Sequence, residues 1–423
     1  MRVIVVGAGW AGCAASISAK KQGAEVVLAE RTDMVLGTGL VGGIMRNNGR
    51  FTATEEMIAM SGGELFQLTD QNSLHRRIEF PGHHHASLYN VATMEPVVKK
   101  FLLQRQIEIN LFTRVDDVEM EGKRIKAVTG KEGEEKISLA GDVFIDTTGT
   151  GGPPGQCTKY GNGCAMCILR CPSFGGRVSL TAKCGVKEMV GKKGDQVGAM
   201  SGSCKLFKES LSREITDTLG KKGVAVIPIP SSLQTGGKLA IKACQQYALP
   251  EFHDNLILLD TGHAKLMTPY FPLEALRKIP GFENARYEDP YAGGLGNSIR
   301  YLGMAPRDNA LKVTGVENLF CAGEKAGLLV GHTEAIVTGT LAGYNAVKLI
   351  KKEKLLTLPN ALAVGDAISH VRSQMETEEG LGYKYTFSGS VYFERMKQKG
   401  LFSIDPEEIK KRVDQAGMTG IFS

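Results

Sequence analysis

Short apolar runs recur along the chain and predict buried parallel strands. These runs cover residues 2–6, 25–30, 142–145 and 318–323. Between the first two, small residues follow a helical pattern from Ala11 to Gln22, and Gly23 suits the left-handed conformation that ends many helices. The first 30 residues therefore predict a strand–helix–strand unit of a parallel sheet.

Other segments extend this picture less regularly. The pattern predicts an antiparallel meander at 115–139, helices at 93–104 and 333–352, and a strand at 107–112. Residues 34–63 are rich in Gly and Asn and give no clear pattern. The parallel pattern is interrupted from residue 151 to about 280, where clusters of Gly and Cys precede a predicted helix near 207–219 and strands at 224–227 and 255–259. We interpret this interruption as an inserted substrate domain.

Composition narrows the class of protein. The chain has 423 residues, 42% of them hydrophobic, and is expected to fold into two or three domains. The net formal charge of +6 is small for this length and there is one Trp, so nucleic acid is not an expected partner. No apolar run approaches the roughly 18 residues that cross a bilayer, and the N-terminus does not resemble a signal peptide. We therefore expect a cytoplasmic protein without a membrane partner.

The motif G-x-G-x-x-G lies at residues 7–12, between the first strand and the first helix. Gly7 permits the tight turn, Gly9 lets the backbone approach a diphosphate, and Gly12 lets the helix pack on the strand. The diphosphate would then lie against free N–H groups at the start of the helix. Glu30 ends the second strand, where a carboxylate can accept a hydrogen bond from a ribose 2′-OH. Together these features predict a dinucleotide without a 2′-phosphate, which the acid would repel.

Two later segments favour FAD over NAD. Residues 143–149, ending in Thr148 and Gly149, resemble the strand and turn that flavoproteins place against the cofactor. Residues 317–324 resemble their second fingerprint, in which a strand ends in a glycine and an acid beside the ribityl and diphosphate groups; here these are Gly323 and Glu324. The helix that starts near His332 would point its positive end at the flavin pyrimidine and stabilise the anion formed on reduction.

Four segments resemble the glucose-inhibited division protein A family, whose superfamily includes FAD-dependent tRNA uridine-modifying enzymes and many FAD-dependent oxidoreductases. These are residues 279–285, 315–320, 331–335 and 339–346. With the sheet segments above, the resemblance covers roughly residues 1–30, 140–150 and 279–350. It implies an FAD-binding fold of the glutathione-reductase type, with binding roles for Gly7, Gly9, Gly12, Glu30, Gly323 and Glu324.

The resemblance does not extend to the residues that would carry out the reaction. The folate-dependent tRNA methyltransferases of this group need a reactive Cys in the region after the second strand, and residues 31–63 contain none. From the length of the sequence we also expect no extended helical tRNA-binding tail like that of the larger members. We therefore expect the cofactor but not the tRNA activity, and keep folate-dependent methyl transfer to tRNA uridine as the alternative function.

A cysteine cluster follows the third predicted parallel strand. Cys157, Cys164, Cys167 and Cys171 have the spacing C-x6-C-x2-C-x3-C-P, whose second half matches the bacterial ferredoxin pattern. Four thiolates this close suit one [4Fe–4S] cluster, which could pass single electrons to or from FAD. A Zn ion, a redox-active disulfide between Cys164 and Cys167, and a set of packed reduced thiols stay open as alternatives.

Three residues are candidates for catalysis. His332 lies next to the predicted flavin-facing start of a helix, where it would neighbour the flavin. Arg46 lies in the glycine-rich stretch that often approaches the isoalloxazine in this fold, and could bind a substrate carboxylate. His84 is the middle of three adjacent histidines that we expect in a partly exposed loop, from which one could serve as an acid or base near the flavin. His263 is a weaker candidate of the same kind.

The sequence therefore predicts an α/β protein with a Rossmann-like FAD/NAD(P)-binding domain of the glutathione-reductase type and an inserted α+β substrate domain. The expected parts are an FAD-binding domain at 1–150 and 281–352, the insertion with the cysteine cluster at 151–280, and a helical segment at 353–423. FAD is expected to lie extended, with its ADP half at residues 7–12 and Glu30 and its flavin near residues 37–43 and 324–333. The remaining predicted cofactor contacts are Ala8, Ala11, Arg31, Gly37, Gly39, Gly43, Thr148, Gly149, Gly331, His332 and Thr333.

The expected function is FAD-dependent oxidoreduction, in which hydride or electrons pass between the flavin and a small organic substrate. The cysteine cluster would connect the flavin to an electron-transfer partner. We also expect a homo-oligomer. A flavin-binding module without turnover is a third possibility.

Overall fold

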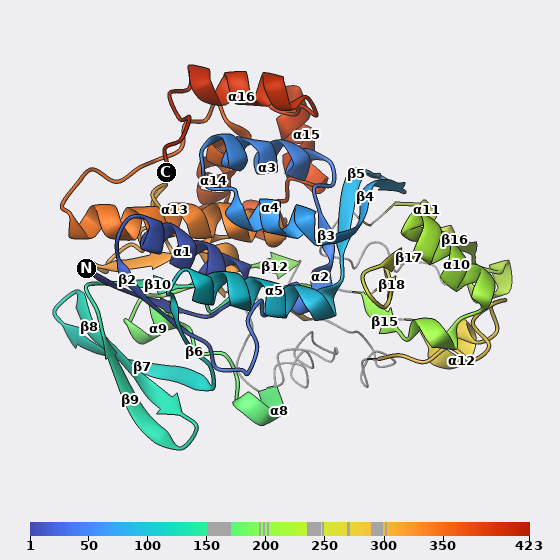
Figure 1. Ribbon diagram of the computed structural model, residues 1–423, viewed down its shortest axis with the longest axis horizontal. Coiled ribbons are helices and arrows are strands. Elements are labelled where there is room, and N and C mark those ends of the chain that lie inside the picture. The colour runs from blue at the N-terminus through green and yellow to red at the C-terminus, as the bar shows by residue number, and fades with distance from the viewer. Residues whose placement is uncertain are drawn as a thin grey trace.

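A five-stranded parallel sheet forms the centre of the larger lobe (Figure 1). Its strands run in the order β21-β10-β1-β2-β6, with bounds β1 Arg2–Val6, β2 Glu25–Ala29, β6 Glu108–Asn110, β10 Val143–Asp146 and β21 Leu319–Cys321. The computed structural model describes residues 1–149, 171–193, 196–197, 199–200, 203–234, 247, 249–268, 271–288, 299–300 and 303–423.

The central strands are apolar because both of their faces are covered. Val3, Ile4 and Val5 of β1 are completely buried, as are Phe144 and Ile145 of β10. A parallel sheet covered on both faces gives continuous apolar runs instead of alternation, which is the pattern that predicted these strands. The carboxyl ends of β1, β2, β10 and β21 meet at one edge, where the chain turns after each strand carry the glycines and acids predicted to bind the cofactor.

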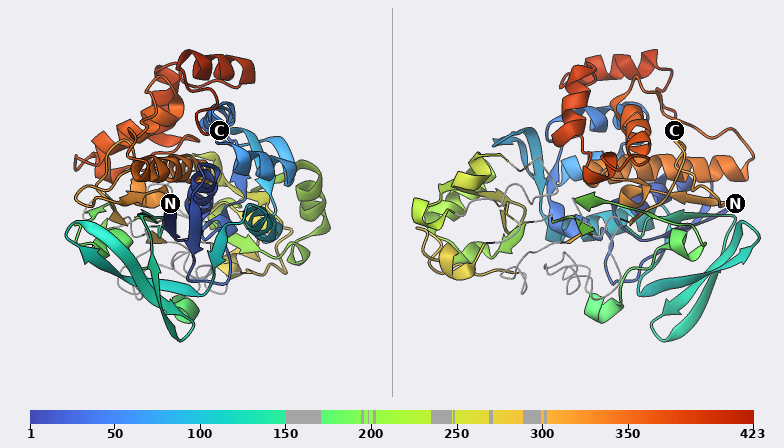
Figure 2. Two further views of the ribbon diagram at one scale, coloured as in Figure 1. Left: turned by 60° about the vertical axis from the view of Figure 1, so that its left-hand side comes forward. Right: turned by 180° about the vertical axis from the view of Figure 1, so that it is seen from behind.

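Two helices pack on one face of the sheet at close range. These are α1 (Trp10–Lys21) and α13 (His332–Ile350). A Cβ on Gly339 would lie 2.2 Å from the carbonyl oxygen of Ala11, and one on Gly343 would lie 2.1 Å from that of Ala15. Glycine at these positions therefore lets the two helix backbones touch. Figures 1 and 2 show these helices on one side of the sheet and the antiparallel meander on the other. The meander comprises β7 Thr113–Glu121, β8 Arg124–Glu132 and β9 Glu135–Ala140.

A second, antiparallel sheet builds the smaller lobe on the right of Figure 1. Its order is β15-β18-β17-β16, with β15 Cys204–Leu206, β16 Val224–Pro228, β17 Asn255–Asp260 and β18 Ala264–Leu266. The helix α10 (Arg213–Lys222) covers it and buries Ile215 and Leu219 in a hydrophobic cluster of its own. Domain boundaries at residues 150, 280 and 352 stay predictions.

The remaining elements connect or cover these two lobes. A three-stranded sheet, β3 Ile44–Met45, β5 His83–Tyr89 and β4 Ser73–Phe80, lies between them. The larger helices are α3 Gly49–Ala59, α4 Glu64–Gln71, α5 Val91–Gln104, α14 Ala363–Gln374, α15 Ser390–Gln398 and α16 Pro406–Gln415. The short helices are α2 Gly39–Gly42, α8 Cys171–Phe174, α9 Leu180–Lys183, α11 Glu251–Asp254 and α12 Leu273–Leu276, with 3₁₀ turns at Lys208–Ser210, Ser231–Leu233, Gly323–Ala326 and Gly380–Gly382. Two-residue strands are β11 Met189–Val190, β12 Lys192–Lys193, β13 Gln196–Val197, β14 Ala199–Met200, β19 Ile299–Arg300 and β20 Gly303–Met304.

Two local predictions are corrected, and one stretch without a prediction is assigned. The histidines at 83–85 lie in strand β5 and not in a loop. The helix predicted at 207–219 begins at Arg213, with Ser212 as its N-cap. The stretch at 34–63, which gave no pattern, contains α2, β3 and α3. Within the described residues, no helix has both the length and the apolar character needed to span a bilayer.

A buried carboxyl group in α3 makes stability depend on pH. Glu56 is fully buried, and its two oxygens accept hydrogen bonds from the N–H groups of Ala363 and Val364 at 2.9 and 3.0 Å. Burial raises the pKa of Glu56 to about 7, although these bonds and Arg412 oppose the rise. A carboxyl whose pKa is raised on folding binds its proton more tightly in the folded state, so its contribution is complete below the unfolded pKa and is lost as the pH rises through about 7.

We therefore expect the free energy of unfolding to fall between about pH 4.5 and pH 7, by up to about 1.4 kcal/mol per pH unit from this group. Urea unfolding of the wild-type protein and Glu56→Gln across this range checks it, because the amide cannot titrate. A wild-type slope that Glu56→Gln leaves intact would show that the dependence comes from other groups.

Candidate cofactor site

Two glycines of the motif after β1 are required by packing. Gly7 has a φ of 103°, and a Cβ there would lie 2.5 Å from the carbonyl oxygen of Thr147. A Cβ on Gly12 would lie 1.9 Å from the carbonyl oxygen of Gly7. The turn between β1 and α1 therefore excludes side chains at both positions, whether or not a ligand is present.

Gly9 is different, because nothing in the described packing requires a glycine there. Its φ of −65° and ψ of 179° are open to any residue. The nearest heavy atom to a Cβ at this position would be the carbonyl oxygen of Leu36, 4.0 Å away. This open space at the start of α1 is what the close approach of a diphosphate needs.

The start of α1 is suited to an anion. Gly9 is the N-cap and offers no side chain, and the first turn contains no acidic residue. The first N–H groups of a helix have no partner within the helix, and the helix dipole adds positive potential at this end. A diphosphate placed against Gly9 would satisfy both features.

Glu30 occupies the end of β2 beside this turn. One carboxylate oxygen accepts a hydrogen bond from Ala8 N at 2.8 Å, and the other accepts bonds from the N–H and hydroxyl of Thr32, both at 3.0 Å. The side chain is thus held in place and buried. Because a carboxylate has about four acceptor positions, it keeps capacity for a ribose hydroxyl.

An open cavity of about 660 Å³ lies against these groups. It is lined by seven predicted cofactor contacts: Gly7, Gly9, Glu30, Arg31, Gly37, Thr148 and Gly149. The wall also includes three residues at the start of the meander, which are far from the glycine turn in sequence but line the same cavity: Thr113, Arg114 and Val115. The uncapped helix start, the glycine that packing does not require and the fixed carboxylate together fit the ADP half of FAD.

Further predicted contacts gather where the chain after β2 meets the start of α13. The His332 ring lies so close to Gly42 that a Cβ there would be 1.5 Å from its Cε1. The Tyr89 hydroxyl donates to the carbonyl oxygen of Gly39 at 3.1 Å and lies 3.5 Å from His332 Nδ1. Burial raises the pKa of Tyr89 to about 12, so it keeps this proton at neutral pH. Gly39, His332 and Thr333, which follows His332 in the first turn of α13, are therefore close together.

A buried ion pair supports the start of α13. The Nε of Arg50 lies 3.2 Å from both carboxylate oxygens of Glu334, and neither side chain is more than 6% exposed. Glu334 also accepts hydrogen bonds from the Thr386 hydroxyl at 2.7 Å and Phe387 N at 2.9 Å, and Arg50 reaches Asn47 Oδ1 at 3.2 Å. This network fixes α13 to α3 and to the chain at 386–387. The sequence analysis missed it because its members come from three distant segments.

The segment that resembles the second flavoprotein fingerprint lies against α1. Gly323 has a φ of 66°, its N–H donates to the Thr338 hydroxyl at 2.9 Å, and a Cβ there would lie 3.0 Å from that of Ala11. Glu324 follows in a 3₁₀ turn and is half-buried. The strand β21 therefore delivers Gly323 and Glu324 to the same edge of the sheet as the glycine motif.

Two of the three catalytic candidates are placed differently from expectation. The guanidinium of Arg46 is bound by Asp70, through Nε at 2.8 Å and Nη2 at 2.6 Å, and by Glu55 through Nη1 at 2.5 Å. Two carboxylates thus occupy three of its N–H donors and balance its charge, which argues against a substrate carboxylate there. His84 is exposed and lies 3.4 Å from Glu79, on the wall of a separate open cavity between β5 and α15. Only His332 lies among the predicted flavin contacts.

The other histidines are placed by packing. His83 is buried, stacks on Phe80 and bonds Asn47 through Nδ1 at 2.9 Å. Burial, with Lys205, Lys265 and Lys208 nearby, lowers the pKa of His263 to about 2. The structure therefore holds His263 as a neutral group in the smaller lobe.

The metal prediction is not tested by the structure. Cys157, Cys164 and Cys167 lie outside the described residues, as does the side chain of Cys171. Elsewhere in the described chain, no group of three or more His, Cys, Asp and Glu side chains is arranged to hold a metal ion. Cys13 and Cys321 are core residues, and burial raises the pKa of each thiol to about 12. Cys204 is buried in the hydrophobic cluster of the smaller lobe.

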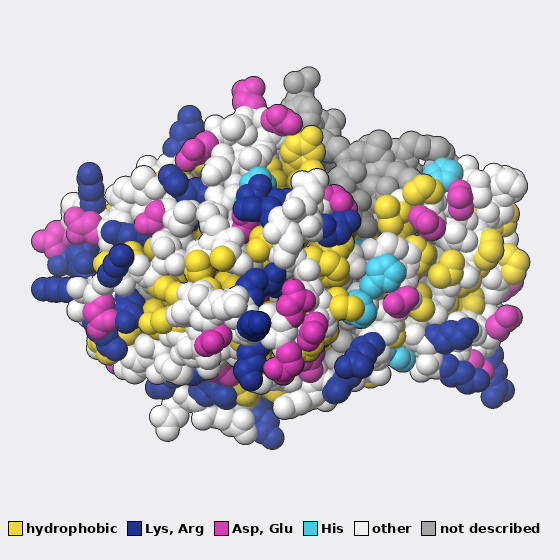
Figure 3. Space-filling view, turned by 90° about the horizontal axis from the view of Figure 1, so that it is seen from above, with side chains coloured by type: hydrophobic (Ala, Val, Ile, Leu, Met, Phe, Trp, Pro, Cys, Tyr) yellow, Lys and Arg dark blue, Asp and Glu magenta, His cyan; other side chains and the backbone are white. Residues whose placement is uncertain are grey.

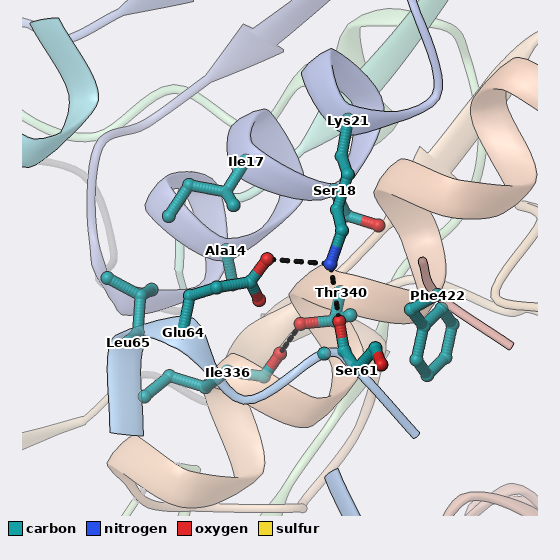
Figure 4. A pocket seen from close by; sticks show the side chains of 11 residues that line it. Ala14, Ile17, Ser18, Lys21, Ser61, Glu64, Leu65, Ile336, Thr340 and Phe422 are labelled. Carbon is teal, nitrogen blue, oxygen red and sulfur yellow. Dashed lines mark hydrogen bonds and ion pairs between the residues drawn. The ribbon is translucent and has the colours of Figure 1, made fainter. Parts of the chain in front are cut away.

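A small cavity at the other end of α1 has no features of a cofactor site. It has a volume of about 260 Å³ and is bounded by α1, α13, α4 and Phe422 (Figure 4). The ammonium group of Lys21 lies between the Glu64 carboxylate at 2.8 Å and the carbonyl oxygen of Ser61 at 2.6 Å. Its polar groups thus bind each other, and the space is a gap between packed helices.

Two family models match the chain. The model described as FAD dependent oxidoreductase matches residues 2–152, and the one described as glucose inhibited division protein A matches residues 261–354. These ranges cover the two halves of the parallel-sheet lobe. They confirm the resemblance stated from the sequence and the FAD-binding class of the fold.

The chain is also similar to curated and solved proteins. It is 23% identical over 419 residues to a tRNA uridine 5-carboxymethylaminomethyl modification enzyme of Desulfotalea psychrophila, covering 85% of this chain and 62% of that protein. It is 33% identical over 103 residues to a methylenetetrahydrofolate–tRNA-(uracil-5-)-methyltransferase of Bacillus cytotoxicus, covering 24% and 22%. The structure of Aquifex aeolicus GidA superposes with a TM-score of 0.65 at 15% identity, covering 99% of this chain and 73% of that one. This last similarity confirms the predicted fold. The chain covers less than two thirds of the length of the two curated relatives, the modification enzyme and the methyltransferase.

Proposed function

We propose that the chain, as a member of the glucose-inhibited division protein A superfamily of FAD-dependent oxidoreductases, passes hydride or electrons between bound FAD and a small organic substrate. The observation that carries the proposal is the start of α1, where an uncapped helix end meets a glycine that the protein's own packing does not require. The adjoining cavity, with Glu30 fixed on its wall, supports the same assignment.

Two groups of residues would bind FAD, one at its ADP half and one at its flavin half. The first turn of α1 would hold the diphosphate and Glu30 the adenosine ribose, while the loop at Gly37–Gly43 and the start of α13 would hold the flavin. Bound FAD supplies the hydride and electron chemistry. His332 is our candidate for holding a proton at the substrate, because it lies at the predicted flavin end with Tyr89 beside its Nδ1.

Anaerobic reduction of the FAD-loaded protein tests the function. Bleaching of the visible flavin bands by an organic donor or a reduced nicotinamide supports an oxidoreductase. A protein that binds FAD but is reduced by none of a broad panel of donors would be a flavin-binding module and would contradict the proposal.

Modification of tRNA uridine is the second candidate, because the named activities of the relatives above concern tRNA. Against it, residues 31–63 contain no Cys to serve as the reactive thiol implied by the methyltransferase resemblance. On the face in Figure 3, Lys and Arg are interspersed with Asp and Glu instead of forming one broad patch. A tRNA gel shift at several salt concentrations separates the candidates, since phosphate contacts give strongly salt-dependent binding. The cytoplasmic location and the homo-oligomer stay predictions.

The [4Fe–4S] cluster is a finer part of the proposal. The segment that carries the four cysteines leaves from Gly149 and returns at residues 176–178, and both of these positions line the cofactor cavity. This cavity is the one assigned to the ADP half of FAD, so support for the cluster comes from the ferredoxin-like spacing of the four cysteines. Protein purified without air is expected to contain iron and sulfide, and Cys164→Ser and Cys171→Ser are expected to lower both. Unchanged iron in these variants, or none in the wild-type protein, would remove the cluster from the account.

A further inference from the structure

Trp10 follows Gly9 in the glycine motif and is the chain's single tryptophan. Its side chain is 2% exposed, yet its indole Nε1 makes no hydrogen bond of ordinary geometry with the described residues, and a polar neighbour is the Tyr89 hydroxyl, whose pKa it lowers slightly against the effect of burial. A buried donor without a partner is costly, because the protein gives it nothing in place of the water it loses. The sequence analysis passed over this residue, although an aromatic side chain inside the motif was the signal for it.

The indole points toward the flavin end of the proposed site. A Cβ on Gly39 would lie 2.5 Å from Trp10 Nε1. The ring meets Tyr89 edge-on, with centroids 6.1 Å apart, and its centroid is 6.2 Å from that of His332. The Tyr89 hydroxyl already donates to Gly39. The indole N–H therefore lies beside the loop and the helix start that are assigned to the flavin.

We propose that the Trp10 indole N–H donates a hydrogen bond to an uncharged oxygen on the flavin half of FAD, a ribityl hydroxyl or a ring carbonyl. This inference rests on the proposed binding of FAD. The diphosphate is assigned to the backbone at Gly9, so the indole one residue later reaches the next part of an extended cofactor. Trp10 then contributes to affinity for FAD but not for ADP, which lacks the flavin half.

Binding of the two ligands to Trp10→Phe tests this, because phenylalanine keeps an aromatic ring and removes the donor. We expect the dissociation constant for FAD to rise about five- to tenfold and that for ADP to stay within about twofold, both measured by calorimetry. Tyr344→Phe is the matched control, because it removes a polar atom from a different buried aromatic residue, which lies in α13. It should leave the affinity for both ligands unchanged. Unchanged FAD affinity, or equal losses for FAD and ADP, would overturn the assignment.

A measurement on the wild-type protein does not depend on the variant folding. Labelling with ¹⁵N-tryptophan gives one indole N–H resonance, which should move downfield and exchange more slowly with water when FAD is added, but not when ADP is added. A resonance that FAD leaves in place overturns the inference. If the folded protein binds no FAD at all, the proposed function fails as well; if FAD binds and the indole does not respond, only this inference fails.

Discussion

Gly9→Ala is expected to abolish tight FAD binding while leaving the fold intact. The backbone at Gly9 is in a conformation that alanine adopts freely, and a Cβ would meet no heavy atom closer than 4.0 Å. The same Cβ would stand between a diphosphate and the first N–H groups of α1. Loss of two charge-assisted hydrogen bonds, each worth about 1.5–3 kcal/mol, lowers the affinity for FAD at least about a hundredfold.

The experiment measures FAD affinity by calorimetry and stability by urea unfolding of the flavin-free protein. The free energy of unfolding should stay within about 1 kcal/mol of wild type. Gly220→Ala is the matched control, because a Cβ at this α10 position also meets nothing within 4 Å but lies in the other lobe. Gly7→Ala should instead destabilise the fold itself, given its clash with Thr147. Wild-type FAD affinity in Gly9→Ala would show that the diphosphate lies elsewhere.

Glu334→Gln is expected to cause the largest loss of stability, about 3–5 kcal/mol. Glu334 is completely buried and is paired with Arg50, whose side chain is 6% exposed. The amide can still accept from Thr386 and Phe387, so the main change is that the guanidinium charge loses its counter-charge. A buried charge left alone is far more costly than a buried pair is stabilising.

The double variant Arg50→Met/Glu334→Gln provides the control. Removing both charges should recover part of the lost stability, so the double variant should be more stable than Glu334→Gln alone. Urea unfolding, with the same flavin content in every sample, gives the free energy of unfolding of the wild type, Glu334→Gln and the double variant. A Glu334→Gln protein within 1 kcal/mol of wild type, or a double variant less stable than the single one, would contradict the role assigned to the pair.

The parts of the fold that the sequence could predict are those in which local pattern and tertiary packing agree. Strands β1, β2 and β10 are buried on both faces, so apolar runs identify them without knowledge of their neighbours. The glycine motif could be interpreted because a side chain at Gly7 or Gly12 would clash within the first strand–helix turn or with Thr147, which follows β10. For the same reason, Glu30 and Gly323 were found from the ends of strands.

The parts that could not be predicted depend on polar groups satisfied across long separations. Helix α3 buries Thr52 and Glu56, whose partners are Ser403 and the start of α14, so its buried face is not apolar and gives no helical pattern. Arg46 was expected at a substrate because it lies in the glycine-rich stretch after the second strand, and the local pattern gave no sign of its contact with Asp70, 24 residues away. Trp10 was overlooked because a tryptophan is ordinarily assigned to the core; its unpaired N–H is visible only once the surrounding atoms are placed.

The most direct measurement is the flavin content and FAD binding of the purified, folded protein. We expect a protein that carries or takes up one FAD per chain, with ADP as a competitor and riboflavin, which lacks both phosphates and the adenosine, bound far more weakly. A well-folded, colourless protein that does not bind added FAD would contradict the central claim that the start of α1, Gly9 and Glu30 form a cofactor site.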